Sequence, residues 1–371
     1  MACREPLALK RAVHILVQTL FCHVMLRLPR VRSLATSAVR TSAWQVPPVH
    51  PPKSAATVAA LQAARTPVAC VTAYDNPTAL ALRGADVDIC LVGDSLANVA
   101  LGRASTRALD IGEMIAHARS VRDALAAPGV SAFAEPLLIV DMPFGSYGVS
   151  LEESVHNVIR VVKETGAAGV KIEGTGELVP LIERLAGLGI LVMGHIGLLP
   201  QRASSASEYR VQGATADTAL DVFRAAKQLD AAGCFSMVIE CVPAKLGDYI
   251  TQHTRAATIG IGAGAHTSGQ VLVCTDIVSD LTSPAHVASV LAAQEASIAP
   301  AQGAAYPPEW PAGPKFVRSF SYPMSVGAAR IEAIQRFVGA VRDRTFPSAD
   351  ESYRIKSAEW AAFVERAEHY S

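Results

Sequence analysis

Four short apolar segments in the middle of the chain each end in an acidic residue. The segments are LVGDS, IVDMP, VKIEG and VIECVP, and their acids are Asp94, Asp141, Glu173 and Glu240. A strand buried on both faces is apolar along its length, so an acid at its end lies just outside the sheet, where a ligand can reach it. If the four strands are parallel neighbours, their carboxylates converge at one mouth. Such a cluster is costly unless a cation or a catalytic role stabilises it.

Two of these acids suit a hard divalent cation. Mg²⁺ prefers oxygen ligands and usually binds one or two carboxylates together with substrate oxygens and water. Asp94 and Asp141 could supply the carboxylates, and Glu173 could complete the ligand set directly or through water. A single Asp at a strand end is more often a helix cap or a loop anchor, whereas three acids on separate strands favour a metal site.

Lys171 and Glu173 occupy alternate positions of one predicted strand, beside Val170 and Ile172. Side chains two residues apart point to the same face of a strand, so the two polar groups share a face. If Val170 and Ile172 face helices, that shared face is the interior. A Lys there is either a structural counter-ion for the carboxylates or a group that binds an anion. Beside a metal and an anionic substrate it can do both.

Glu240 follows an apolar segment and is a candidate general base, because burial would make its carboxylate bind a proton more readily. The alternative is an acid paired with a neighbouring Lys or Arg. His195 lies near the end of another predicted strand, and either reaches the site or is a core residue with satisfied hydrogen bonds. Three more side chains, in loops after predicted strands, could contact a large second substrate: Tyr147, Tyr209 and Gln212.

Apolar segments alternate with amphipathic helical segments from residue 67 onward. The eight predicted strands lie at 67–75, 89–95, 133–143, 169–174, 191–197, 235–243, 257–264 and 270–276. The clearest predicted helices between them lie at 111–125, 150–166, 177–189 and 215–233. Eight strands with helical crossovers over about 220 residues predict an α/β fold, a (β/α)8 TIM barrel. The alternative is an open doubly wound sheet, which would place several of the acids far apart.

The amino-terminal segment differs in composition from the rest. Residues 1–54 contain eight basic residues and one acid and are rich in Arg and Ser, which predicts a mitochondrial transit peptide and hence a mitochondrial location. The segment ends in a Pro-rich linker at 46–54; the alternative for the whole segment is a disordered basic tail. Its most apolar part, 14–26, is too short for a membrane span. The remaining 25 basic and 32 acidic residues leave no footprint for nucleic acid.

The carboxyl-terminal third breaks the strand and helix alternation. Residues 279–312 are rich in Ala and Pro and predict an insertion, and helices are predicted at 325–346 and 357–370. We therefore expect one barrel domain over 55–371 that includes this insertion and these helices.

The seven cysteines form no recognisable metal or disulfide pattern. Their number is odd, no CxxC spacing occurs, and several lie within apolar segments. Buried free thiols in a reducing compartment explain this usage better than disulfides or zinc.

Seven ordered motifs resemble those of the ketopantoate hydroxymethyltransferase (3-methyl-2-oxobutanoate hydroxymethyltransferase) family: VTAYD, LVGDSLANVALG, VKIEG, HIGLLPQ, YRVQG, IECVP and GIGAG. The resemblance covers about residues 55–278 and returns at 314–320. It implies a (β/α)8 barrel of the phosphoenolpyruvate and pyruvate-binding type. It also implies transfer of a one-carbon unit from 5,10-methylenetetrahydrofolate to 3-methyl-2-oxobutanoate, giving 2-dehydropantoate for pantothenate and coenzyme A biosynthesis.

The resemblance also implies roles for individual residues. Asp94 and Asp141 look like Mg²⁺ ligands, with Glu173 as the third. The residues that look like keto-acid contacts are Asp94, Ser95, Asp141 and Lys171. Glu240 looks like the general acid/base. His195 is a candidate further contact behind the metal ligands because of its position near a strand end, and the resemblance assigns it no role.

The chemistry of a 2-oxo acid agrees with these roles. Its carboxylate and keto oxygens can chelate Mg²⁺, which lowers the cost of removing the C3 proton and stabilises the resulting enolate. Lys171 would add positive charge where negative charge develops. The enolate carbon would then attack the methylene group of the folate, and water would complete release of the hydroxymethyl product.

Two other hypotheses keep the barrel but change the function. One is a Mg²⁺-dependent carbon–carbon lyase or phosphonomutase of the same barrel type, and the other is a catalytically inactive metal-binding barrel. The family resemblance further implies a homo-oligomer, such as a decamer. Leu199 and Ser268 depart from the family pattern, since Thr and Asp are common at these two positions.

Overall fold

Eight parallel strands form the centre of the protein. The computed structural model describes residues 50–128, 133–203, 209–282, 287 and 325–370. The strands are β1 (Val68–Thr72), β2 (Ile89–Val92), β3 (Leu137–Asp141), β4 (Gly169–Glu173), β5 (Leu191–Gly197), β6 (Ser236–Glu240), β7 (Ala257–Ile261) and β8 (Gly269–Leu272). They close into a barrel in chain order, with β1 paired to both β2 and β8. This confirms the predicted (β/α)8 barrel and excludes the open doubly wound sheet.

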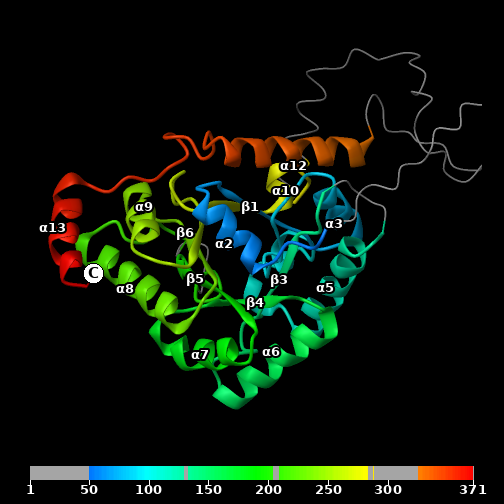
Figure 1. Ribbon diagram of the computed structural model, residues 1–371, viewed down its shortest axis with the longest axis horizontal. Coiled ribbons are helices and arrows are strands. Elements are labelled where there is room, and N and C mark those ends of the chain that lie inside the picture. The colour runs from blue at the N-terminus through cyan, green and yellow to red at the C-terminus, as the bar shows by residue number, and fades with distance from the viewer. Residues whose placement is uncertain (1–49, 129–132, 204–208, 283–286, 288–324, 371) are drawn as a thin grey trace, which may run out of the picture. The chain divides into compact units, whose positions relative to one another are not determined.

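Helices surround the strands (Figure 1). They are α2 (Ala55–Ala63), α3 (Asn76–Arg83), α4 (Leu96–Val99), α5 (Ile111–Leu125), α6 (Leu151–Thr165), α7 (Val179–Gly187), α8 (Ala216–Ala232), α9 (Ala244–Gln252), α10 (Cys274–Ile277), α12 (Val326–Arg342) and α13 (Ser357–Ala367). The start and stop signals of α6 are confirmed, since the Ser150 side chain accepts a hydrogen bond from Glu153 N and Gly166 follows with a φ of 67°. Periodicity missed α2, because its Ala-rich faces differ little.

The last predicted strand is shorter than expected. Residues 270–276 were predicted as one strand, but β8 ends at Leu272 and Cys274 begins α10. The Cys274 amide donates a hydrogen bond to the Thr72 hydroxyl at the end of β1. This bond satisfies the amide outside the sheet, where the chain turns into a helix.

The interior of the barrel is polar at the carboxyl ends of the strands and apolar along the rest of their length. In β4, Val170 and Ile172 pack in the apolar layer between strands and helices, so Lys171 and Glu173 face the interior. A separate apolar cluster fills the interior: Val68, Cys70, Ile89, Leu91, Leu137, Ile139, Met193, Val238, Ala257, Ile259 and Val271. Val58 of α2 belongs to this cluster, so α2 covers the amino-terminal end of the barrel.

The two predicted carboxyl-terminal helices pack on the outside of the barrel. The α12 helix contacts α3 and β1, and α13 contacts α8 (Figure 1). Phe363 of α13 lies edge-on to Phe223 and Tyr249, with ring centroids 6.1 and 5.2 Å apart. Most of the predicted insertion at 279–312 lies outside the described residues. Among the described helices, none combines the length and the apolar character that a membrane crossing requires.

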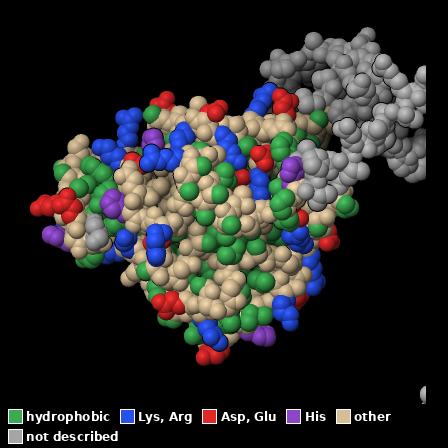
Figure 2. All heavy atoms as spheres, viewed as in Figure 1, with side chains coloured by type: hydrophobic (Ala, Val, Ile, Leu, Met, Phe, Trp, Pro, Cys, Tyr) green, Lys and Arg blue, Asp and Glu red, His purple; other side chains and the backbone are tan. Residues whose placement is uncertain are grey.

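The described part of the chain has a surface of mixed charge and cysteines that form no disulfide. On the face drawn in Figure 2, acidic and basic side chains are interspersed rather than gathered by sign. The five described cysteines are all free; Cys241 is partly exposed, and Cys70, Cys90, Cys234 and Cys274 are buried. This confirms the prediction of free thiols for these five residues.

Lys53, in the segment predicted as linker, is tied to the barrel. Its Nζ lies 2.8 Å from Asp86 Oδ1 and 2.9 Å from Asp88 Oδ1. Asp88 is buried, and its other oxygen accepts from Ala69 N at 2.8 Å and lies 2.7 Å from Arg342 Nη2 of α12. One carboxylate therefore joins Lys53, β1 and α12, so the segment predicted as linker contacts the barrel at Lys53.

Lys53→Met is expected to lower the free energy of unfolding by about 1–3 kcal/mol, because Asp88 loses a charged donor while it stays buried. Urea unfolding would measure the change. Lys163→Met, on the exposed side of α6, is the matched control and should change stability by less than about 0.5 kcal/mol. Equal stability of the two variants would contradict the proposed anchoring role.

Candidate active site

All seven predicted site residues line a single cavity at the carboxyl ends of the strands. They are Asp94, Ser95, Asp141, Lys171, Glu173, His195 and Glu240, and the cavity has a volume of about 190 Å³. Three of the four acids are the last residues of their strands, namely β3, β4 and β6. Asp94 differs from the prediction, because β2 ends at Val92 and Asp94 lies two residues beyond it.

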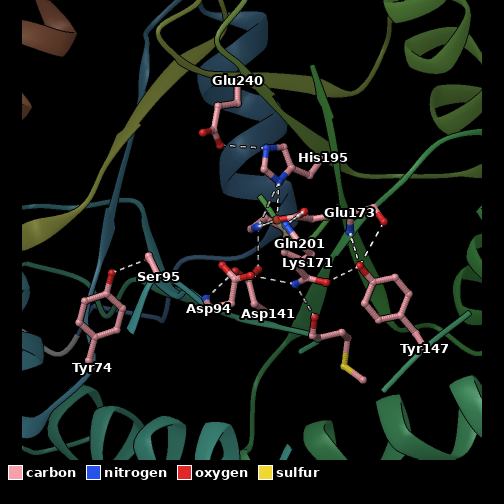
Figure 3. Close-up of polar contacts among 11 residues, drawn as sticks. Tyr74, Asp94, Ser95, Asp141, Tyr147, Lys171, Glu173, His195, Gln201 and Glu240 are labelled. Atoms are coloured by element: carbon pink, nitrogen blue, oxygen red, sulfur yellow. Dashed lines mark hydrogen bonds and ion pairs between the residues drawn. The ribbon is translucent and has the colours of Figure 1, made fainter. Parts of the chain in front are cut away.

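Lys171 lies among the carboxylates (Figure 3). Its Nζ is 3.0 Å from Asp141 Oδ1 and 3.9 Å from Glu173 Oε1. Burial acts to lower the pKa of Lys171, but the charges of Asp141, Glu173 and Asp94 outweigh burial and raise it. The ammonium group is therefore charged, and the predicted role as counter-ion agrees with its position.

His195 reaches the site and connects two of the acids (Figure 3). Its Nδ1 lies 3.2 Å from Glu173 Oε1, and its Nε2 lies 3.1 Å from Glu240 Oε2. Burial and the Lys171 charge act to lower the pKa of His195, but Glu173 and Glu240 outweigh both and raise it to about 9. Burial also opposes ionisation of Glu173, yet His195 and Lys171 lower the pKa of that carboxyl.

Glu240 is less buried than expected, with 22% of its side chain exposed. Its partner is His195, rather than the Lys or Arg that the alternative interpretation supposed. The reason is its position at the end of β6, where the side chain extends past the buried polar layer. Glu240 is consequently the acid of this group with the most access to the cavity and to solvent.

The metal-free site should lose stability as His195 loses its proton. A His whose pKa is raised from 6.5 to about 9 stabilises the fold fully below pH 6.5, and this contribution disappears as the pH rises through 9. We expect the free energy of unfolding to fall by up to about 1.4 kcal/mol per pH unit across this window from this group alone. Urea unfolding at several pH values should show that His195→Gln lacks this slope, whereas the exposed control His156→Gln keeps it. Equal slopes in all three proteins would refute the assignment.

Asp94 and Asp141 lie side by side, as the predicted metal site requires. The Asp94 amide donates to Asp141 Oδ2 at 2.9 Å. Burial and the charge of Asp141 raise the pKa of Asp94 to about 7. The contact between Lys171 and Asp141 is an ion pair without hydrogen-bond geometry, so Asp141 Oδ1 remains able to accept another ligand. Both carboxylates therefore gain from a nearby cation.

The predicted trio of metal ligands is not assembled as a trio. Among the residues that the structure describes, no three His, Cys, Asp or Glu side chains are arranged to hold a metal ion together. Glu173 Oε1 lies 3.2 Å from His195 Nδ1 and 3.9 Å from Lys171 Nζ in ion pairs without a hydrogen bond, and its Oε2 accepts from Gln201 N. Asp94 and Asp141 by themselves supply two carboxylates, which is a common protein contribution to a Mg²⁺ site.

Sequence reasoning missed Gln201 and Tyr74, which contact predicted site residues. Gln201 is buried, and its Nε2 donates to Asp94 Oδ2 at 2.9 Å. Tyr74 is buried, and its hydroxyl is 2.7 Å from Ser95 Oγ, so it orients a predicted substrate contact. Gln201 is the last residue of the HIGLLPQ motif, and Tyr74 lies in the VTAYD motif. Neither the hydrophobic periodicity nor the spacing of polar residues indicates that they belong to the site.

The three loop residues considered for a second substrate have different positions. Tyr209 lines the cavity. Tyr147 instead donates to Gln201 Oε1 at 2.8 Å and lies behind the acids. Gln212 donates to the Arg210 carbonyl. Tyr209 is therefore the member of this group placed to contact a ligand.

Comparison with known proteins points to one family. The family described as "Ketopantoate hydroxymethyltransferase" matches residues 53–303 of the chain. The 3-methyl-2-oxobutanoate hydroxymethyltransferase of Lysinibacillus sphaericus (strain C3-41) is 36% identical over 296 residues, covering 80% of this chain and 92% of the relative. The protein of the same name from Anaeromyxobacter sp. (strain Fw109-5) is 39% identical over 286 residues, covering 77% and 82%.

A phosphoenolpyruvate phosphomutase from Streptomyces platensis subsp. rosaceus is similar in structure, with a TM-score of 0.47 and 18% identity over 67% of this chain and 92% of that chain. This likeness carries no functional argument. The sequence matches do, because they cover most of this chain and most of each relative. The chain therefore belongs to the ketopantoate hydroxymethyltransferase family.

Proposed function

We propose that the protein is a 3-methyl-2-oxobutanoate hydroxymethyltransferase. It transfers a hydroxymethyl group to 3-methyl-2-oxobutanoate from 5,10-methylenetetrahydrofolate and water, giving 2-dehydropantoate and tetrahydrofolate, a step of pantothenate and coenzyme A biosynthesis. The observation that carries the proposal is the family membership together with one cavity lined by the acids and Lys171. The relatives' names favour this reaction over the lyase and phosphonomutase hypotheses.

The charges of the site support Mg²⁺ as its cofactor. The polar layer contains four carboxylates and two cationic groups: Asp94, Asp141, Glu173, Glu240, Lys171 and His195. With all four carboxylates ionised, the layer carries an excess of two negative charges, which one divalent cation would offset. Asp94 and Asp141 would hold the ion, and Glu173 would support it through water. When bound, Mg²⁺ supplies Lewis acidity toward the oxygens of the 2-oxo acid.

The side chains around the cavity divide the remaining tasks. Ser95, held by Tyr74, and Lys171 present a hydroxyl and an ammonium group to an anionic substrate. Lys171 stabilises negative charge that develops on the substrate when its C3 proton is removed. Glu240 handles the proton, and His195 Nε2, 3.1 Å away, orients the Glu240 carboxylate.

The assay for this proposal uses the chain from residue 50 onward, with 3-methyl-2-oxobutanoate, methylenetetrahydrofolate and Mg²⁺. Formation of 2-dehydropantoate, measured by mass spectrometry, is the expected result, and its absence would overturn the proposal. Omission of the folate tests the lyase alternative, because cleavage of a 2-oxo acid without folate would indicate that reaction. Metal binding without any turnover would indicate an inactive barrel.

Two further properties follow from the sequence and are proposed on that basis. The Arg-rich segment 1–54 supports import into the mitochondrion, which a fluorescent fusion of this segment tests. Cleavage of the transit peptide on the amino-terminal side of Lys53 would preserve the ion pairs of Lys53 with Asp86 and Asp88. The family resemblance supports a homo-oligomer such as a decamer, and sedimentation velocity would measure its size.

A further inference from the structure

Gln201 is buried behind the acids and does not line the cavity. It lies in the turn after β5, which is anchored because Leu198 N donates to the Glu240 carbonyl at 2.9 Å. Gly197 permits this close approach, since a Cβ there would lie 2.2 Å from the same carbonyl oxygen and its φ is +87°. The backbone thus places Gln201 beside the acids without a contact to the cavity.

Gln201 contacts both Asp94 and Glu173. Its backbone N–H donates to Glu173 Oε2 at 3.0 Å. Its side-chain Nε2 donates to Asp94 Oδ2 at 2.9 Å and to the Met142 carbonyl at 3.0 Å, next to Asp141 in the chain. A single residue therefore connects the ends of β2, β3 and β4, where the proposed metal-binding acids lie.

The amide of Gln201 can adopt only one orientation. Both hydrogens of Nε2 are used, and Oε1 accepts from the Tyr147 hydroxyl at 2.8 Å. A flipped amide would place Oε1 against the Asp94 carboxylate and the Met142 carbonyl, which are both acceptors. The Tyr147 hydroxyl in turn accepts from Glu173 N at 3.2 Å. Its single hydrogen faces two acceptors, Gln201 Oε1 at 2.8 Å and the Glu173 carbonyl at 3.1 Å, and Gln201 is the nearer.

We propose that Gln201, oriented by Tyr147, is a positioning residue for the divalent cation, and that it holds the carboxylates of Asp94 and Glu173 in the arrangement the ion requires. This inference rests on the metal site of the proposed function. Groups that orient metal ligands typically contribute 10- to 100-fold to metal affinity, about the size of effect expected here. Gln201 does not line the cavity, so it would affect metal affinity and would not contact the substrate. Substitution of Gln201 should therefore change the turnover rate at saturating metal only slightly.

The experiment measures Mn²⁺ binding from the electron paramagnetic resonance signal of free Mn²⁺, without substrates. Gln201→Met, which keeps the chain length but removes all three side-chain hydrogen bonds, should raise the Kd for Mn²⁺ about 10- to 100-fold. Its kcat at saturating Mg²⁺ should stay within a few-fold of the unaltered protein, while the Mg²⁺ concentration for half-maximal activity rises. Gln228→Met, on the exposed side of α8, is the matched control and should bind Mn²⁺ normally.

Tyr147→Phe keeps the inference testable if Gln201→Met fails to fold. It leaves the Gln201 amide in place without its orienting donor, and a smaller increase in Kd, of a few-fold, is expected. Unchanged Mn²⁺ affinity in a folded Gln201→Met protein, or in Tyr147→Phe, would overturn the inference. Loss of kcat at saturating metal with unchanged Kd would also overturn it. Absence of Mn²⁺ binding by the unaltered protein would instead contradict the metal site of the proposed function.

Discussion

Glu240→Gln is expected to lower kcat by about 10²- to 10⁴-fold, the usual contribution of a general acid/base. The amide matches the carboxylate in shape and can still contact His195 Nε2, but it cannot take up a proton. Glu240 is outside the Asp94 and Asp141 pair, so binding of Mn²⁺ and of 3-methyl-2-oxobutanoate should change little. The measurements are steady-state turnover, Mn²⁺ binding and calorimetric titration of the 2-oxo acid.

The step that uses Glu240 can be separated from the rest of the reaction. Exchange of the C3 proton of 3-methyl-2-oxobutanoate with deuterated water, followed by nuclear magnetic resonance, reports on proton removal alone. Loss of exchange in Glu240→Gln would place the residue at that step, and retained exchange would place it in a later proton transfer. The exposed control Glu183→Gln should behave as the unaltered protein. Near-normal turnover of Glu240→Gln would contradict the acid/base role.

Asp141→Asn is expected to weaken divalent-cation binding by more than about 100-fold, beyond the range typical of an outer partner of a metal site. Both Asp141 oxygens face donors, Lys171 Nζ at 3.0 Å and Asp94 N at 2.9 Å. Either orientation of an Asn side chain therefore sets its NH₂ group against a donor. Lys171 also loses its nearest counter-charge while it stays buried, so the free energy of unfolding should fall as well.

Mn²⁺ binding and urea unfolding of Asp141→Asn measure these two effects. Asp123→Asn, on the exposed side of α5, is the matched control for both. The pair of active-site variants tests the division of roles: Asp141→Asn should lose metal, whereas Glu240→Gln should lose turnover with its metal retained. Equal loss of metal binding in both would show that the two acids share one task.

Much of the site could be predicted because strands impose a strict alternation of side chains. The order Val170, Lys171, Ile172, Glu173 placed two polar groups on one face, and eight recurring apolar segments indicated a closed barrel around that face. Acids at the ends of parallel strands then had to meet. The parts that were predicted well are those in which local sequence and backbone period determine position.

Only the tertiary structure decided how these groups pair. Gln201 and Tyr147 come from loops after β5 and β3, and no periodicity relates a loop residue to a strand that precedes it by many residues. The same holds for His195, whose two nitrogens reach acids on the two neighbouring strands because of the register between β4, β5 and β6. The sequence by itself determined the barrel and the acids at its mouth. The closure of the barrel and the paths of its loops decided which acids face a cation, which one faces solvent and which residues orient them.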